Sequence, residues 1–166
     1  MDAPYILISN HHSMLDPLFL CYACKQHEIR WLGKKEIGKM PVISWFAKKI
    51  NMIHVDRHNT DMAAMRQCMA EVKNGGVLGI FPEGTRSKKW NQMGEFHGGS
   101  FRCAVKAQCP VVPMAFVDSF RVLDEKGSKK VAVQLHYLEP IPYEAYRGLK
   151  TVELAELVKS RIAEKI

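Results

Sequence analysis

The chain alternates short apolar runs with longer amphipathic stretches, which is the pattern of strands interleaved with helices. The apolar runs predict buried strands at residues 4–9, 29–33, 51–55, 77–81 and 111–117. The amphipathic stretches predict helices at residues 16–26, 40–50, 60–73, 99–107 and 151–166. This alternation predicts an α/β fold: a single domain with a mixed, largely parallel central β-sheet flanked by helices.

Three local features refine this prediction. Residues 120–123 and 131–137 have strand-like composition on either side of a polar turn, so we expect them to pair as a late hairpin. Pro113 lies inside a predicted strand, and because proline donates no backbone hydrogen bond we expect an edge strand or a bulge there. Asp16 and Pro17 suit the N-cap and the first helical position of the first helix.

Composition places the chain among ordinary globular proteins. Its 166 residues, 47% hydrophobic and 25% charged, suffice for one domain with a sizeable core. The longest apolar runs fall far short of a membrane span, and the first residues lack the basic start of a secretory signal. We therefore expect the five cysteines to be reduced thiols in a cytosolic compartment. Cys21 and Cys24 leave redox or metal chemistry open, although the lack of a second Cys pair favours ordinary packing.

The positive charge is concentrated in two segments. The formal net charge is +7, and residues 30–50 and 86–106 together hold eleven of the 24 basic residues but only two of the 17 acidic ones. Such local charge is expected where a protein faces phosphate, a phospholipid surface or an acidic partner. The basic segments match no nucleic-acid-binding motif, so no nucleic-acid partner is expected. A candidate membrane-docking patch is instead made by Trp45, Phe46, Lys48 and Lys49.

The polar segment after the first predicted strand carries a histidine and a carboxylate at close spacing. His11 and Asp16 are separated by four residues. A histidine can take a proton from a hydroxyl, and a carboxylate on its other ring nitrogen fixes the tautomer. A turn between the two residues would bring the carboxylate back to the ring. His11 is therefore a candidate general base with Asp16 as its partner; the alternative is a helix cap beside an ordinary loop histidine.

A second polar segment also follows a predicted strand. It reads Phe-Pro-Glu-Gly-Thr-Arg-Ser at residues 81–87. Gly84 lets the backbone approach a ligand closely, and Arg86 offers a planar fork suited to two hydrogen bonds with one phosphate. Two weaker segments are Val-Asp-Arg at residues 55–57 and Val-Val-Pro at residues 111–113. Because open α/β sheets place their sites at strand ends, the two strong segments are the candidate site.

Taken in order, these four segments resemble the motif blocks of the glycerolipid acyltransferases, most closely the 1-acylglycerol-3-phosphate (lysophosphatidic acid) acyltransferases. A Lys-Glu segment within residues 31–36 falls where the family has a similar one. The resemblance covers nearly the whole chain. It implies that residues 1–166 form one acyltransferase domain with a glycerol-3-phosphate acyltransferase-like fold.

The resemblance also implies a reaction: transfer of a fatty acyl group from acyl-CoA or acyl carrier protein to a glycerol hydroxyl, giving phosphatidic acid in phospholipid biosynthesis without a cofactor. It makes His11 the general base and Asp16 its orienting partner. It assigns the acceptor's phosphate and glycerol to Lys34, Arg57, Glu83, Gly84 and Arg86. It further implies a lysophospholipid acceptor and a peripheral position on the cytoplasmic face of a membrane.

Two features depart from the family pattern. Members usually carry a lysine in a Phe-Lys-x-Gly stretch, where this chain has Phe-His-Gly-Gly at residues 96–99. Members also usually carry a membrane-associating segment upstream of the first block, and we expect that segment to be absent from residues 1–166. Stable membrane docking would then depend on other parts of the surface.

Three other interpretations stay open on sequence grounds. His-His-x3-Asp at residues 11–16 also matches condensation-type acyltransferases, in which the second histidine, here His12, would be the base; that family continues with glycine where this chain has Pro17. In the second interpretation, the enzyme acylates a different acceptor, which is glycerol-3-phosphate, another lysophospholipid or a lyso-ornithine lipid. Finally, a basic α/β domain can bind anionic lipid without catalysing a reaction.

Overall fold

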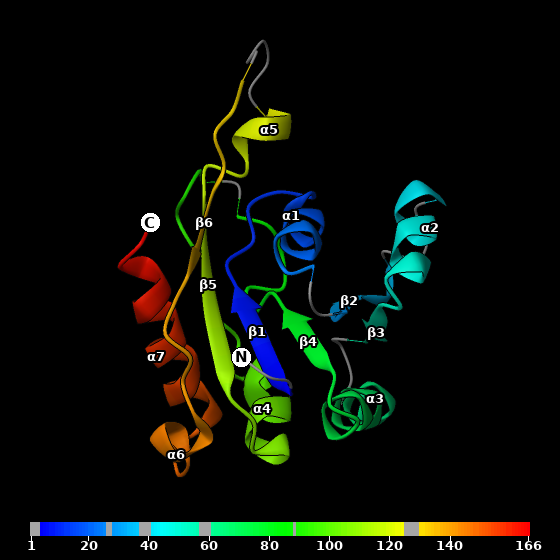
Figure 1. Cartoon of the computed structure of the whole chain (residues 1–166), viewed down its shortest axis with the longest axis vertical. Coiled ribbons are helices and arrows are strands. Elements are labelled where there is room, and N and C mark those ends of the chain that lie inside the picture. Colours follow the sequence, from blue (N-terminus) through cyan, green and yellow to red (C-terminus); the bar gives the residue numbers. More distant parts are fainter. Residues whose placement is uncertain (1–3, 26–27, 37–40, 57–60, 88, 125–129) are drawn as a thin grey trace.

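The computed structural model describes residues 4–25, 28–36, 41–56, 61–87, 89–124 and 130–166. Its centre is a six-stranded sheet in the order β3-β2-β4-β1-β5-β6 (Figure 1). The strands are β1 (Tyr5–Ser9), β2 (Ile29–Lys34), β3 (Ile53–Val55), β4 (Val77–Ile80), β5 (Val111–Val117) and β6 (Gln134–Tyr137). Every described pairing is parallel except that of β6 with β5. The predicted single α/β domain with a mixed, largely parallel sheet is confirmed.

Helices cover both faces of the sheet. The helices are α1 (Asp16–Ala23), α2 (Pro41–Lys49), α3 (Met62–Lys73), α4 (Arg102–Ala107), α5 (Arg121–Asp124), α6 (Tyr143–Tyr146) and α7 (Thr151–Ala163). Ile6 and Ile8 of β1 belong to the core shared with α3, α4 and α7. Tyr5 and Leu7 face the opposite side and belong to the core shared with Leu20 of α1. Because both faces of β1 are buried, its sequence is an unbroken apolar run.

The first helix begins one residue earlier than its sequence indicates. Leu15 is the N-cap of α1, with no side-chain cap, and Asp16 is the first helical residue. The prediction of Asp16 as the N-cap is wrong because its carboxylate turns back to the preceding loop, where Oδ2 accepts the N–H groups of His12 and Ser13 at 2.8 Å each. Asp61, in contrast, is a true N-cap of α3 and accepts from the N–H of Ala64 at 2.9 Å.

The prediction of a late hairpin is wrong, and so is the prediction that Pro113 lies in an edge strand. Residues 121–124 form the short helix α5, and β6 pairs with β5 instead. β5 lies between β1 and β6, inside the sheet. The pairing shifts by one residue between Met114↔Tyr137 and Val111↔Ile141, as at a bulge, and Pro113 lies within that shift. The helix predicted at residues 99–107 begins as the 3₁₀ turn Gly98–Phe101.

The topology brings the two strongest sequence segments together. β1 and β4 are parallel neighbours, with Ile8 opposite Ile80 at their carboxyl ends. The loop after β1 and the loop after β4 therefore leave the sheet side by side, at the edge formed by the carboxyl ends of its parallel strands. Helices α1 and α2 lie toward this same edge (Figure 1).

Candidate active site

The side chain of Asn10 anchors the loop that leaves β1. Its amide donates to the backbone oxygen of Phe116 at 2.9 Å and accepts from the backbone N–H of Phe116 at 2.8 Å. Asn10 is fully buried. Its side chain thus imitates one more peptide of the β1–β5 pairing, and it fixes where the following residue, His11, begins.

The backbone of His11 is held by the loop after β4. Its N–H donates to Glu83 Oε1 at 2.7 Å, and its carbonyl oxygen accepts from the N–H of Ser87 at 2.8 Å. The other carboxylate oxygen of Glu83 accepts from the N–H of Gly94 at 2.6 Å. Burial raises the pKa of Glu83, and this effect outweighs the opposing influence of the two N–H donors. Glu83 thus ties three chain segments together through backbone groups.

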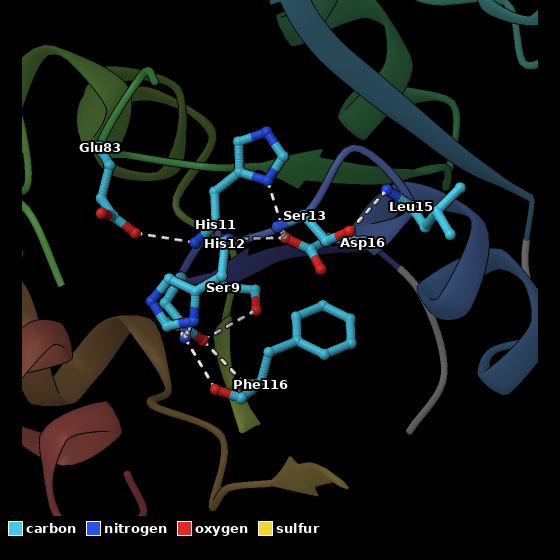
Figure 2. Close-up of polar contacts among 9 residues, drawn as sticks. Ser9, His11, His12, Ser13, Leu15, Asp16, Glu83 and Phe116 are labelled. Atoms are coloured by element: carbon cyan, nitrogen blue, oxygen red, sulfur yellow. Dashed lines mark hydrogen bonds and ion pairs between the residues drawn. The ribbon is translucent and has the colours of Figure 1, made fainter. Parts of the chain in front are cut away.

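The His11 side chain meets Asp16 as the sequence spacing predicts. Its Nδ1 lies 2.9 Å from Asp16 Oδ2 (Figure 2). The Asp16 side chain is fully buried, whereas that of His11 is 18% exposed. Because an ionised carboxylate only accepts hydrogen bonds, Nδ1 is the protonated nitrogen in this arrangement and Nε2 carries the lone pair. The residue at position 11 is therefore set up to accept a proton at Nε2.

His12 points into the protein interior. It is 1% exposed, and its ring lies 3.3 Å from the amide nitrogen of Asn10. Burial lowers the pKa of the His12 ring, which favours the neutral form; the nearby Asp16 opposes this shift only partly. A buried ring packed against Asn10 is poorly placed to meet a substrate hydroxyl. The geometry therefore favours His11 over His12 as the base.

A cavity of about 210 Å³ opens in front of the His11 ring. Lys34 at the end of β2 and Gly84 and Arg86 in the loop after β4 line it together with His11. The structure thus brings together four of the residues singled out in the sequence. Glu83 is buried and accepts hydrogen bonds from the backbone N–H groups of His11 and Gly94. Arg57 lies outside the described residues.

A second, larger cavity lies next to the first. It measures about 580 Å³ and shares Leu32, Gly33 and Phe81 with the smaller one. Its walls come from α3, from the end of β4 and from α4. Apolar lining residues include Met65 and Ile80, and basic ones include Arg102 and Lys106.

Several residues that shape the site were not singled out from the sequence. Asn10 is one, although its place directly after a predicted buried strand could have marked it as continuing the strand pairing. The aromatic rings of Trp31 and Phe81 were not linked to His11, yet Phe81 stacks on its imidazole with centroids 4.2 Å apart. No local pattern marks that contact, because it joins residues from separate strands.

The cysteines contribute thiols to packing. Cys21, Cys24, Cys68, Cys103 and Cys109 are all free. Cys21 accepts a hydrogen bond from the indole Nε1 of Trp31 at 3.3 Å, and Cys24 lies 3.7 Å from the hydroxyl of Tyr137. Among the residues that the structure describes, no three His, Cys, Asp or Glu side chains are grouped to hold a metal ion.

The sequence is similar to those of known proteins. The family model described as Acyltransferase matches residues 1–117. The chain is 29% identical over 167 residues to the chloroplastic 1-acyl-sn-glycerol-3-phosphate acyltransferase BAT2 of Brassica napus, covering 99% of this chain and 47% of that protein. It is 27% identical to the 1-acyl-sn-glycerol-3-phosphate acyltransferase of Bacillus subtilis, covering 98% of this chain and 81% of that protein.

A solved structure is also similar. The 1-acyl-sn-glycerophosphate (LPA) acyltransferase PlsC of Thermotoga maritima superposes with a TM-score of 0.78 at 26% sequence identity, over 99% of this chain and 66% of that one. The chain spans about half the length of the chloroplast relatives it matches.

Proposed function

Because the chain belongs to the acyltransferase family, we propose that it transfers a fatty acyl group from a thioester donor, acyl-CoA or acyl carrier protein, to the free hydroxyl of 1-acylglycerol-3-phosphate. The product would be phosphatidic acid. The observation that carries this proposal is the His11–Asp16 pair facing a cavity that is also lined by Lys34 and Arg86.

His11 is the general base in this reaction. Nε2 takes the proton of the acceptor hydroxyl while the hydroxyl oxygen attacks the thioester carbon. Asp16 stabilises the imidazolium that forms on His11. The tetrahedral intermediate then collapses, the carbon–sulfur bond breaks, and the imidazolium returns the proton to the leaving thiolate. The products are the new ester and a free thiol, and His11 is regenerated.

Lys34 and Arg86 hold the acceptor by its phosphate. Both line the cavity in front of His11, one from the end of β2 and the other from the loop after β4. Arg86 can form two parallel hydrogen bonds with one phosphate, and Lys34 adds a point charge. Gly84 lines the same cavity and has a φ of +69°, a backbone conformation that favours glycine, so no side chain stands between the backbone and the glycerol there. Arg57, which the family resemblance adds to this group, lies outside the described residues.

The larger cavity is the candidate binding groove for the acyl chain. It begins beside Phe81, which also lines the cavity of His11, and its inner walls carry apolar side chains such as Met65 and Ile80. A fatty acyl chain needs continuous apolar surface from the reacting carbon onward. The wall that it shares with the His11 cavity, made by Leu32, Gly33 and Phe81, is what supports this assignment.

Glu83 acts on the backbone rather than on the acceptor in this proposal. Both of its carboxylate oxygens are occupied by the N–H groups of His11 and Gly94. Glu83 therefore positions the His11 loop against the loop after β4. This differs from the direct acceptor contact that the family resemblance implies.

We propose that the surface around the site docks on a membrane from its cytoplasmic side. No helix in the described part of the chain is long and apolar enough to cross a bilayer. Tyr22 of α1 and Trp45 of α2 are 72% and 64% exposed. Lys25 Nζ lies 4.1 Å from the Tyr22 ring centroid, and Lys49 Nζ lies 5.7 Å from that of Trp45. Exposed aromatic rings beside lysines suit an anionic lipid interface. Phe46, also expected in this patch, has a side chain outside the described part.

The docking surface has its own test. Tyr22→Ala combined with Trp45→Ala should reduce co-sedimentation with vesicles that contain anionic lipid. Val152→Ala, which removes an exposed apolar side chain from α7, is the matched control. Equal binding of all three proteins would exclude these two aromatic residues as anchors.

The reaction is tested by thiol release from acyl-CoA and acyl-carrier-protein thioesters in detergent, with and without lysophosphatidic acid. We expect acceptor-dependent release that is lost in His11→Ala and largely kept in His12→Gln. Parallel assays with glycerol-3-phosphate, a different lysophospholipid and a lyso-ornithine lipid identify the acceptor. A folded protein that binds anionic vesicles but releases no thiol with any acceptor would instead support the non-catalytic lipid-binding function.

A further inference from the structure

Three rings from three different segments form a column that ends at the candidate base. The ring of Trp31, in β2, stacks on that of Phe81 with centroids 5.1 Å apart and planes inclined by 11°. Phe81, directly after β4, stacks on His11 with centroids 4.2 Å apart and planes inclined by 22°. The column runs from the buried core to the cavity, since Trp31 is 1% exposed and Phe81 is 8% exposed.

The inner end of the column is fixed in place. The indole N–H of Trp31 donates to the thiol of Cys21 in α1 at 3.3 Å. On the sheet, the indole lies over Gly79 of β4. A Cβ atom at position 79 would lie 2.5 Å from both Cε3 and Cζ3 of the indole and 2.8 Å from Cγ2 of Ile29, all closer than real Cβ contacts allow. Gly79 therefore leaves the space that Trp31 occupies, and its role is steric rather than a matter of backbone freedom.

The hydrogen bond to Asp16 does not by itself fix the His11 ring. It holds Nδ1 at one edge of the ring but makes no contact with the ring faces, so it resists a tilt of the ring about the Cβ–Cγ bond only through its own directionality. The flat face of Phe81 opposes this tilt directly, because turning the imidazole would break the stack. With both contacts in place, the direction of Nε2 is determined.

We propose that Phe81 and Trp31 are positioning residues for His11, and that Gly79 supports them by making room for the indole. This inference rests on the proposed function of His11 as the general base. Neither aromatic residue takes part in proton transfer. They set the angle at which Nε2 meets the acceptor hydroxyl, and small errors of position at a reacting atom are costly in rate.

A steric rescue tests the inner end of the column. Gly79→Ala should push the indole toward Phe81 and lower kcat by roughly 10- to 100-fold, with the KM for lysophosphatidic acid nearly unchanged. Trp31→Phe removes the two nearest of the three atoms that the new methyl group would meet and keeps an aromatic face against Phe81, so it is the reference for the double variant. Because only Cγ2 of Ile29 then remains close to the methyl group, the double variant should recover much of the kcat lost in Gly79→Ala, toward that of Trp31→Phe. Unchanged kcat in Gly79→Ala, or no recovery in the double variant, would overturn the proposal.

A readout without turnover separates this proposal from the enzyme assignment. The ring protons of His11, assigned by comparison with His11→Ala, should be shifted upfield in the NMR spectrum by the ring current of Phe81. Gly79→Ala should reduce that shift and the double variant should restore it. If the wild-type protein transfers no acyl group but the shifts behave in this way, the proposed function fails while the column stands.

A second pair of variants covers the case in which Gly79→Ala does not fold. Phe81→Tyr keeps an aromatic face against His11, and Phe81→Leu keeps an apolar side chain without one. We expect Phe81→Tyr to retain most of kcat and Phe81→Leu to lose about tenfold or more. Equal kcat in the two variants would overturn the proposal.

Discussion

The Nδ1 atom of His11 and the Oδ2 atom of Asp16 are 2.9 Å apart, and the same Oδ2 atom accepts the backbone N–H groups of His12 and Ser13. One carboxylate oxygen thus orients the imidazole and shapes the loop that carries it. Because Asp16 is fully buried, its negative charge is compensated by these donors rather than by water. The arrangement makes Asp16 both a structural and a chemical partner of His11.

Replacing Asp16 by asparagine separates these two contributions. An amide oxygen can still accept from His12 and Ser13, so we expect the fold to persist. It cannot stabilise a positive charge on His11 as a carboxylate does, and kcat should fall by about 10³- to 10⁴-fold. Thiol-release kinetics measure the loss, and thermal unfolding verifies the fold.

Asp118→Asn is the matched control for this experiment. Asp118 follows β5, another strand of the same sheet, and its carboxylate contacts Asn91 and Arg121 rather than a ring in the site. We expect near-normal turnover in Asp118→Asn. Comparable activity in Asp16→Asn would remove Asp16 from the mechanism.

Arg86 should contribute mainly to acceptor binding. A hydrogen bond to a charged group is worth about 1.5–3 kcal/mol, so Arg86→Gln should raise the KM for lysophosphatidic acid by roughly 10- to 100-fold. Arg86→Lys keeps the charge but loses the planar fork, and should fall between the wild type and Arg86→Gln. The measurement is the KM of each variant at saturating acyl donor.

An uncharged acceptor distinguishes phosphate recognition from a general defect. With monoacylglycerol, Arg86→Gln and the wild type should have similar kcat/KM. Lys89→Gln removes a nearby exposed positive charge and serves as the control for long-range electrostatics. A loss of the same size with both acceptors would show that Arg86 does not act on the phosphate.

The buried strands could be predicted because an unbroken run of apolar residues indicates burial directly. β5 is buried on both faces, and its apolar run at residues 111–117 predicted the observed bounds, Val111–Val117. The partner of β6 was not predictable in the same way. Residues 120–123 and 131–137 are close in sequence, but the open edge of β5 is the partner that β6 takes, and that choice depends on non-local contacts.

The same limit applies to the site. The spacing of His11 and Asp16 predicted their contact, because a turn joins residues that are near in the chain. The contacts of Glu83 depend on β1 and β4 being neighbours, which strand order in the sheet decides and local sequence does not. The stack of Trp31 on Phe81 has the same origin, since β2 is the other neighbour of β4.

Glu83→Gln tests whether this residue holds the His11 loop. A glutamine has one acceptor oxygen and one donor nitrogen, so it cannot accept from the N–H groups of both His11 and Gly94. One buried N–H loses its partner, and the free energy of unfolding should fall by about 1–3 kcal/mol. We expect a lower kcat with an unchanged KM for the acceptor. Urea denaturation and steady-state kinetics provide the two measurements.

A direct contact between Glu83 and the acceptor predicts the opposite outcome. In that case Glu83→Gln would raise the acceptor KM and leave the unfolding free energy close to that of the wild type. Glu95→Gln, an exposed carboxylate in the segment that follows, is the control for the loss of one negative charge.

His12 should make the stability of the fold depend on pH in the mildly acidic range. Burial lowers the pKa of His12 in the folded protein below the ordinary value of about 6.5. Above the ordinary value, both the folded and the unfolded states are neutral at this position. As the pH falls below it, the unfolded chain binds a proton before the folded protein does. Stability is therefore lost as the pH falls toward the folded pKa, by up to about 1.4 kcal/mol per pH unit.

His12→Gln removes this titration, so its unfolding free energy should depend less on pH than that of the wild type between pH 7.5 and 5. The substitution also changes packing against Asn10, but that cost is the same at every pH and only the slope matters. His97→Gln, which removes an exposed histidine, is the control for the loss of one imidazole. Parallel curves for His12→Gln and the wild type would mean that His12 titrates alike in both states. The buried, neutral histidine inferred from the geometry would then be wrong.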